Sequence, residues 1–93
     1  MDFDWDEKKN QKNIKDHRIS FEEAKSVFFD AYRLEFEDSS NTEERYHVIG
    51  MAYGLLLFVV YTLREVKGIP KIRIISARKA DAYEKNKYFQ NDR

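Results

Sequence analysis

Two arginines at the ends of apolar segments are the residues best suited to phosphate chemistry. Arg78 and Lys79 follow the apolar run Ile72–Ala77, and Arg64 ends an earlier apolar segment. A guanidinium group is always charged and can hold two phosphate oxygens at once. A strand end would hold it rigidly, as a site that stabilises developing negative charge requires. The alternative interpretation is that these arginines are ordinary solvated charges at two strand ends, with no role in binding.

Alternating apolar and polar residues predict the strands that carry these arginines. In the clearest case, Tyr32, Leu34 and Phe36 alternate with charged residues, which is typical of a half-buried strand. Gly54 marks a tight hairpin, and residues 66–71 look like a longer connection. The predicted strands cover residues 2–5, 32–37, 44–53, 55–64 and 71–77.

Helix signals precede and follow these strands. Residues 6–17 are helix formers with acids first and bases later, which suits the helix dipole. Ser20 and Glu23 have the spacing of a capping box that opens a second helix. Residues 79–90 form a third, polar helix. Short connections between successive strands predict an α+β fold, an antiparallel meander with helices packed on one face.

Strand alternation also predicts which side chains share a face. Arg64 would lie on the face of the even-numbered residues of its strand. Arg78 would share a face with Ile74 and Ser76, opposite Arg73. Both faces of the central strands are apolar, so alternation alone does not identify the helix-covered face, and a bulge would shift the assignment.

Length and composition limit the class of protein. The 93 residues provide one core, so we expect a single domain over 1–93. The absence of cysteine excludes disulfides, thiolate nucleophiles and cysteine zinc sites, and it suits a reducing compartment. The acidic N-terminus has no apolar segment of a secretory signal, and the apolar run Leu55–Tyr61 is too short to cross a bilayer. We therefore expect a cytoplasmic protein without membrane contact.

The net charge of zero conceals an uneven distribution. Residues 20–45 carry eight acids and three bases, whereas residues 64–93 carry nine bases and four acids. The basic third could face a polyanion, although these could equally be ordinary solvated surfaces. The pattern permits an RNA partner without requiring one.

An ordered set of motifs spans nearly the whole chain. It begins with Phe3-Asp4-Trp5-Asp6 and continues with His17 before Ser20-Phe21-Glu22-Glu23-Ala24. Later pieces are Glu44-Arg45, Val59-Val60-Tyr61-Thr62 with Arg64, and Ile72 through Ala80, with Tyr88 beyond. In this order the motifs resemble the BrnT family of type II toxin–antitoxin toxins, within the wider RelE-like ribonuclease toxins.

The resemblance implies a metal-independent endoribonuclease that inhibits translation and needs no cofactor. It implies neutralisation by a BrnA-like antitoxin, through which the pair would bind operator DNA. The implied fold is a RelE-like twisted antiparallel sheet of about four strands plus a short N-terminal strand, with two N-terminal helices and a C-terminal helix. Two alternatives are a non-catalytic module that binds protein or nucleic acid, and a relative that poisons DNA gyrase.

In such an enzyme the ribose 2′-OH attacks the adjacent phosphate, so a base and a stabiliser of negative charge are required. Arg64 and Arg78 are the expected stabilisers, close together on one surface of the sheet. His17 and Glu44 are the candidate bases. The first could equally cap its helix, and the second could form a simple ion pair.

Three further side chains are candidates for RNA contacts. Arg45, Lys79 and Tyr88 could bind backbone phosphate or stack on a base, although Tyr88 could simply pack. His47 is interpreted as structural, because no second metal-type ligand lies at a suitable spacing. The family usually has glycine after the histidine, whereas Arg18 stands here and must adopt a left-handed conformation if the turn is kept.

Overall fold

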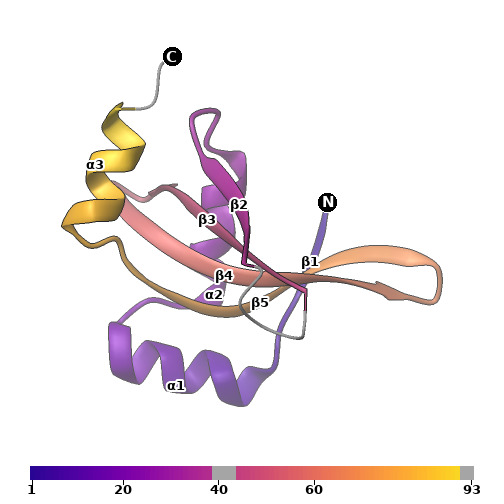
Figure 1. Cartoon of the computed structure of the whole chain (residues 1–93). Helices are drawn as coiled ribbons and strands as arrows, with labels where there is room; N and C mark the ends of the chain where they lie inside the picture. The colour runs from indigo at the N-terminus through magenta and orange to yellow at the C-terminus, as the bar shows by residue number, and fades with distance from the viewer. Residues whose placement is uncertain (39–43, 91–93) are drawn as a thin grey trace.

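A single five-stranded sheet organises the molecule, and helices lie against both of its faces (Figure 1). The structure is a computed structural model that describes residues 1–38 and 44–90. The α+β class agrees with the expectation, as does the presence of two N-terminal helices and one C-terminal helix. In chain order the elements are β1 (Asp2–Asp4), α1 (Glu7–His17), α2 (Phe21–Ala24), the 3-10 helix η1 (Lys25–Phe29), β2 (Leu34–Asp38), β3 (Arg45–Ala52), β4 (Leu55–Val66), β5 (Ile69–Lys79) and α3 (Ala82–Gln90).

The sheet is mixed, with strand order β1-β5-β4-β3-β2. Strands β2 to β5 form the expected antiparallel meander. The N-terminal strand β1 instead runs parallel to β5 and pairs with it at Lys71–Arg73. The four strands expected to be antiparallel are so, and the added N-terminal strand, whose direction the sequence left open, makes the sheet mixed. The chain between β1 and β2 crosses from one edge of the sheet to the other through α1, α2 and η1.

Both hairpins of the central strands have two-residue turns. Tyr53 and Gly54 join β3 to β4 with φ angles of 51° and 79°, and Lys67 and Gly68 join β4 to β5 with 52° and 79°. Two successive positive φ angles match the twist of the flanking strands, which is why such turns favour glycine. The tight hairpin at Gly54 is confirmed. The longer connection expected over 66–71 is wrong, because both strands continue to the turn.

The helix signals near the N-terminus are confirmed in detail. Ser20 and Glu23 form a complete capping box. Arg18 ends α1 with φ 59°, and its N–H donates to the carbonyl of Ile14. The left-handed turn is thus kept without glycine. The helix that opens at Phe21 ends at Ala24, however, and continues as η1.

The two faces of the sheet carry different helices, so the expected packing of all helices on one face is wrong. Alternate residues of β3 and β4, such as Val48 and Val59, belong to the main core under α1, α2 and η1. Their neighbours, such as Ile49 and Phe58, belong to a smaller cluster under α3. We call these the α1–α2 face and the α3 face. On the α3 face the register places Leu34, Phe36, His47, Ile49, Met51, Leu56, Phe58, Val60, Thr62, Arg73, Ser76 and Arg78.

Two buried asparagines attach α1 to the rest of the fold. The Asn13 amide donates to the carbonyls of Ile19 and Ala77 at 2.8 and 2.9 Å and accepts from the Ala77 N–H at 3.1 Å. Asn10 accepts from the Phe21 N–H at 2.8 Å. Because β1 pairs only with Lys71–Arg73 of β5, the bonds to Ala77 satisfy backbone groups on the open part of the β5 edge, and the bonds to Ile19 and Phe21 fix the turn between α1 and α2.

Replacing Asn13 with alanine should lower the free energy of unfolding by about 3 kcal/mol, because three buried backbone bonds lose their partner. Urea denaturation followed by circular dichroism measures this. Asn86→Ala is the matched control, since Asn86 is exposed on α3. Equal midpoints for the two variants would show that water replaces the Asn13 amide without penalty.

Candidate functional site

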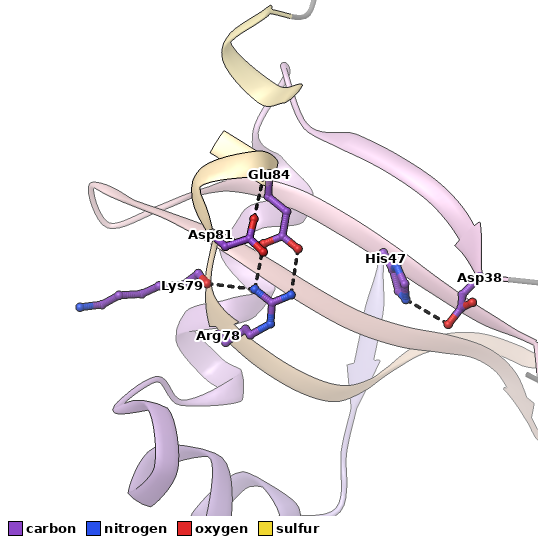
Figure 2. A network of polar contacts seen from close by, with 6 residues as sticks. All are labelled: Asp38, His47, Arg78, Lys79, Asp81 and Glu84. Carbon is purple, nitrogen blue, oxygen red and sulfur yellow. Dashed lines mark hydrogen bonds and ion pairs between the residues drawn. The ribbon is translucent and has the colours of Figure 1, made fainter. Parts of the chain in front are cut away.

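Helix α3 covers only part of the α3 face. Polar side chains lie on the uncovered part, near the centre of the sheet. Ile49, Leu56, Ala80 and Tyr88 form the buried contact between helix and sheet. Beside this contact lie Arg78, His47 and further polar residues on neighbouring strands (Figure 2). This open region is therefore the candidate site.

Arg78 is held in place by the first turn of α3. Its Nη1 and Nη2 donate to Oε1 and Oε2 of Glu84, each at 2.8 Å, and Nη1 also donates to the Lys79 carbonyl at 3.2 Å. The guanidinium lies 4.2 Å above the centre of the Phe58 ring. The hydrogen bonds to Glu84 raise the pKa of Arg78, against the opposing effect of burial. The group is thus charged and fixed in orientation.

This arrangement leaves one edge of the guanidinium available. The bonds to Glu84 and Lys79 use both hydrogens of Nη1 and one of Nη2. Nε and the second hydrogen of Nη2 form no hydrogen bond within residues 1–38 and 44–90. These two N–H groups make a parallel pair of donors, the geometry that binds two oxygens of a phosphate. The Arg78 side chain is 39 % exposed, so a ligand can reach it.

Arg64 lies far from Arg78, and the expectation of neighbouring arginines is wrong. Arg64 pairs with Lys71, whereas Arg78 pairs with Phe58, six positions away along β4. At about 3.3 Å per residue the two Cα atoms are separated by roughly 20 Å along the strand. Arg64 is exposed on β4 beyond the last residue that pairs with β3, and by alternation it shares the α3 side with Lys71 of β5, which also pairs with Asp2 of β1.

A bulge in β5 changes the expected order of faces. The register shifts between Val60 and Tyr61, so that Ile75 becomes the extra residue of β5. Arg73 consequently lies on the same face as Arg78, and Ile74 on the other. Arg73 forms an ion pair with Asp4 at 3.3 Å. The predicted opposition of Arg73 and Arg78 was wrong for this reason.

Neither candidate base lies beside Arg78. His17 is exposed at the end of α1 and lines a hollow between α1 and β5, together with Ile75 and Ser76. Glu44 immediately precedes β3; its side chain is exposed, and its carbonyl accepts from the Thr62 hydroxyl at 2.7 Å. The structure therefore does not bring either residue together with Arg78.

The three residues expected to bind RNA have different environments. Arg45 is half-buried at the start of β3, at the register position opposite Asp38 on the α3 face. Lys79 is exposed but pairs with Leu57, whose side chain is in the core of the opposite face. Tyr88 is buried, and its hydroxyl donates to the carboxylate of Asp30. A stacking role for Tyr88 is therefore wrong, because its ring is already packed.

His47 was interpreted as structural, yet it lies in the centre of the open region. Its Nε2 is 3.3 Å from Oδ2 of Asp38 (Figure 2). The rings of Phe36 and Phe58 flank it. The pairing of Phe36 with His47 depends on the β2–β3 register, which the sequence did not specify. Within the described chain, no group of three or more His, Cys, Asp and Glu residues is placed to hold a metal ion. None of its helices is long and apolar enough to span a membrane.

Comparison with known proteins identifies the family. No curated protein matches the chain. The family model described as "Ribonuclease toxin, BrnT, of type II toxin-antitoxin system" matches residues 5–84, which include every strand after β1 and the first turn of α3. Type II systems pair a toxin with an antitoxin protein, so membership implies such a partner. This chain therefore belongs to the BrnT family of type II ribonuclease toxins.

Proposed function

We propose that this chain, as one RelE-like domain, is a toxin that cleaves RNA by attack of a ribose 2′-OH on the adjacent phosphate, without a metal ion. The toxin would cleave RNA in the cytoplasm and thereby inhibit translation. A BrnA-like antitoxin would neutralise the toxin, and the complex would contact operator DNA through the antitoxin. Family membership and the geometry of Arg78 support the proposal.

The observation that carries the proposal is the fixed guanidinium of Arg78. Its free Nε and Nη2 donors would bind the non-bridging oxygens of the phosphate that is attacked. These oxygens gain negative charge in the transition state, and donors already fixed in place stabilise that charge without reorganisation. Because Glu84 neutralises the net charge of Arg78, the hydrogen-bond geometry contributes more here than overall attraction.

The ribbon of β4 and β5 supplies the unbalanced positive charge. Arg64 and Lys71 lie at paired positions, and neither forms an ion pair with any residue in the described parts of the chain. Like charges opposite each other on a ribbon are unfavourable. Asp2 of β1 lies opposite Lys71 on its other side, whereas Arg64 has only Lys71 as a register partner within the described strands. Arg64 would thus bind the RNA backbone away from the cleaved bond. Arg45 and Lys79 would make further backbone contacts, whereas His17 and Glu44 would not touch the phosphate held by Arg78.

Purified toxin should cleave RNA equally well in EDTA and in magnesium, because the proposed chemistry uses the 2′-OH and side chains alone. The products should carry 2′,3′-cyclic phosphate and 5′-hydroxyl ends, detectable by mass spectrometry. A 2′-deoxy nucleotide at the cleaved position should abolish the reaction.

Activity restored only by a divalent metal would contradict this mechanism. A tight complex with the antitoxin but no RNA cleavage would instead favour a non-catalytic binding module. If supercoiling fails before RNA in arrested cells, gyrase would be the target.

Arg78→Lys should lower the cleavage rate by about 100-fold, because lysine keeps the charge but lacks the paired donors. Single-turnover kinetics with saturating enzyme measure this rate. Arg33→Lys is the control, since Arg33 is also paired to a glutamate, Glu35, at 3.2 Å, but lies across the sheet from Arg78. An unchanged rate in Arg78→Lys would remove Arg78 from the chemical step.

Arg64→Ala should weaken RNA binding and leave the rate of the bound complex nearly unchanged. Loss of one phosphate contact should reduce the slope of log K against log salt by about 1. Fluorescence anisotropy with an uncleavable 2′-deoxy-substituted oligonucleotide measures the affinity and its salt slope, and single-turnover kinetics measure the rate. Lys25→Ala, on η1, is the control. A lower rate at saturating RNA with unchanged affinity would place Arg64 in the catalytic site instead.

A further inference from the structure

His47 is held in one orientation from three directions. Asp38 of β2 lies 3.3 Å from its Nε2. The ring of Phe36, also from β2, is edge-on at 5.5 Å, and the ring of Phe58 from β4 is tilted at 4.8 Å. The side chain is 21 % exposed, so it is constrained but still open to a ligand. A histidine that only filled space would not need a carboxylate aimed at its ring.

The contact with Asp38 determines which nitrogen is available. In neutral imidazole one nitrogen carries the proton and the other is an acceptor. A carboxylate beside Nε2 selects the tautomer protonated there, which leaves the lone pair on Nδ1. No hydrogen bond to Nδ1 is formed by any residue in the described parts of the chain. His47 therefore presents an oriented acceptor that a substrate proton can reach.

His47 and Arg78 flank the same aromatic ring. The His47 ring centre is 4.8 Å from the centre of Phe58, and Cζ of Arg78 is 4.2 Å from it, so the two groups are at most 9.0 Å apart. The Cα register agrees, because His47 pairs with Val60, Val60 with Ser76, and Arg78 lies two residues beyond Ser76. One ribose and its adjoining phosphate can span this distance.

We propose that His47 is the general base of RNA cleavage and that Asp38 is its positioning residue. This inference rests on the proposed function of the chain. Nδ1 of His47 takes the proton of the 2′-OH while the 2′-oxygen forms a bond to phosphorus. The bond from phosphorus to the 5′-oxygen breaks, and that oxygen leaves with its electron pair and takes a proton from water. Asp38 stabilises the imidazolium, which then returns its proton to solvent.

The geometry favours His47 over the two bases expected from the sequence. His17 lies at the end of α1, next to the edge of β5, and Glu44 points to solvent. Neither shares the ring of Phe58 with Arg78. His47 also has a carboxylate to orient it, the arrangement found where histidine transfers protons in enzymes.

Charged groups from every neighbouring element face His47. They are Asp38 on β2, Arg45 on β3, Arg78 on β5 and Lys87, which lies 5.4 Å above the Phe36 ring. Glu84 on α3 offsets Arg78. Because a general base acts in its neutral form, the rate should rise from acidic pH to a plateau.

The test compares His47→Gln with His17→Gln in the full chain, using an RNA oligonucleotide that the wild type cleaves. His47→Gln should lower kcat by about 100- to 10,000-fold, change KM by less than about threefold, and remove the acid limb of the pH–rate profile. His17→Gln should match the wild type. Asp38→Asn should lower kcat and leave KM nearly unchanged, because the imidazole loses the carboxylate that orients it.

A second variant separates chemistry from folding. Added imidazole should restore part of the activity of His47→Ala, which a purely structural role would not allow. A His47→Gln protein that keeps the wild-type rate and acid limb, or a His47→Ala protein that stays inactive in imidazole despite a native circular dichroism spectrum, would overturn the inference and leave the ribonuclease proposal intact. If the wild type cleaves no RNA, both proposals fail together.

Discussion

The ion pair between Arg78 and Glu84 places α3 and, at the same time, determines what Arg78 can bind. Only Ala80 and Asp81 separate β5 from the helix, and the Ala80 N–H donates to the Leu56 carbonyl at 2.9 Å, so the chain must turn into α3 immediately after the sheet. Glu84 limits the direction by accepting from both Nη atoms of Arg78 and from the Asp81 N–H. Asp81 accepts in return from the Glu84 N–H at 2.8 Å, which completes a reciprocal cap of the helix. At the far end of α3, Tyr88 is bonded to Asp30.

The same pair explains why the site must work through geometry. Glu84 has a side chain that is only 10 % exposed, and removal of its partner would leave a nearly buried carboxylate without compensation. Arg78 therefore cannot turn away from Glu84 to face a substrate. It offers a fixed edge above Phe58, and a phosphate must adapt to that edge. Arg73 with Asp4 repeats this pairing of cation and acid on the same face, so uncompensated charge is concentrated on the ribbon near Arg64.

Local structure could be predicted from the sequence, whereas the distances between side chains on different strands could not. Hydrogen-bonding residues at fixed spacing, such as Ser20 with Glu23, act within one turn, and alternation along Leu34–Asp38 acts within one strand, so both could be read directly. The separation of Arg64 and Arg78 depends on the length of the hairpin and its two-residue turn at Lys67 and Gly68, which alternation does not report. The face of Arg73 depends on a single extra residue at Ile75. The importance of His47 depends on pairing with Phe36 across a connection that contains no periodic signal.

The different helix cover of the two faces of the sheet explains where a site can form. The α1–α2 face buries fully apolar residues such as Val48, Val59 and Ile74 beneath three helical segments, so no ligand can reach the centre of the sheet from that side. On the α3 face, one short helix covers only the end of the sheet near Ile49 and Leu56. The polar side chains on the adjoining, uncovered part of this face must then form hydrogen bonds with solvent, with each other or with a ligand. In this uncovered region, the rings of Phe36 and Phe58 pack against His47, and Phe58 also packs against Arg78. The two polar groups are therefore held in fixed orientations on a surface that a polyanion can reach.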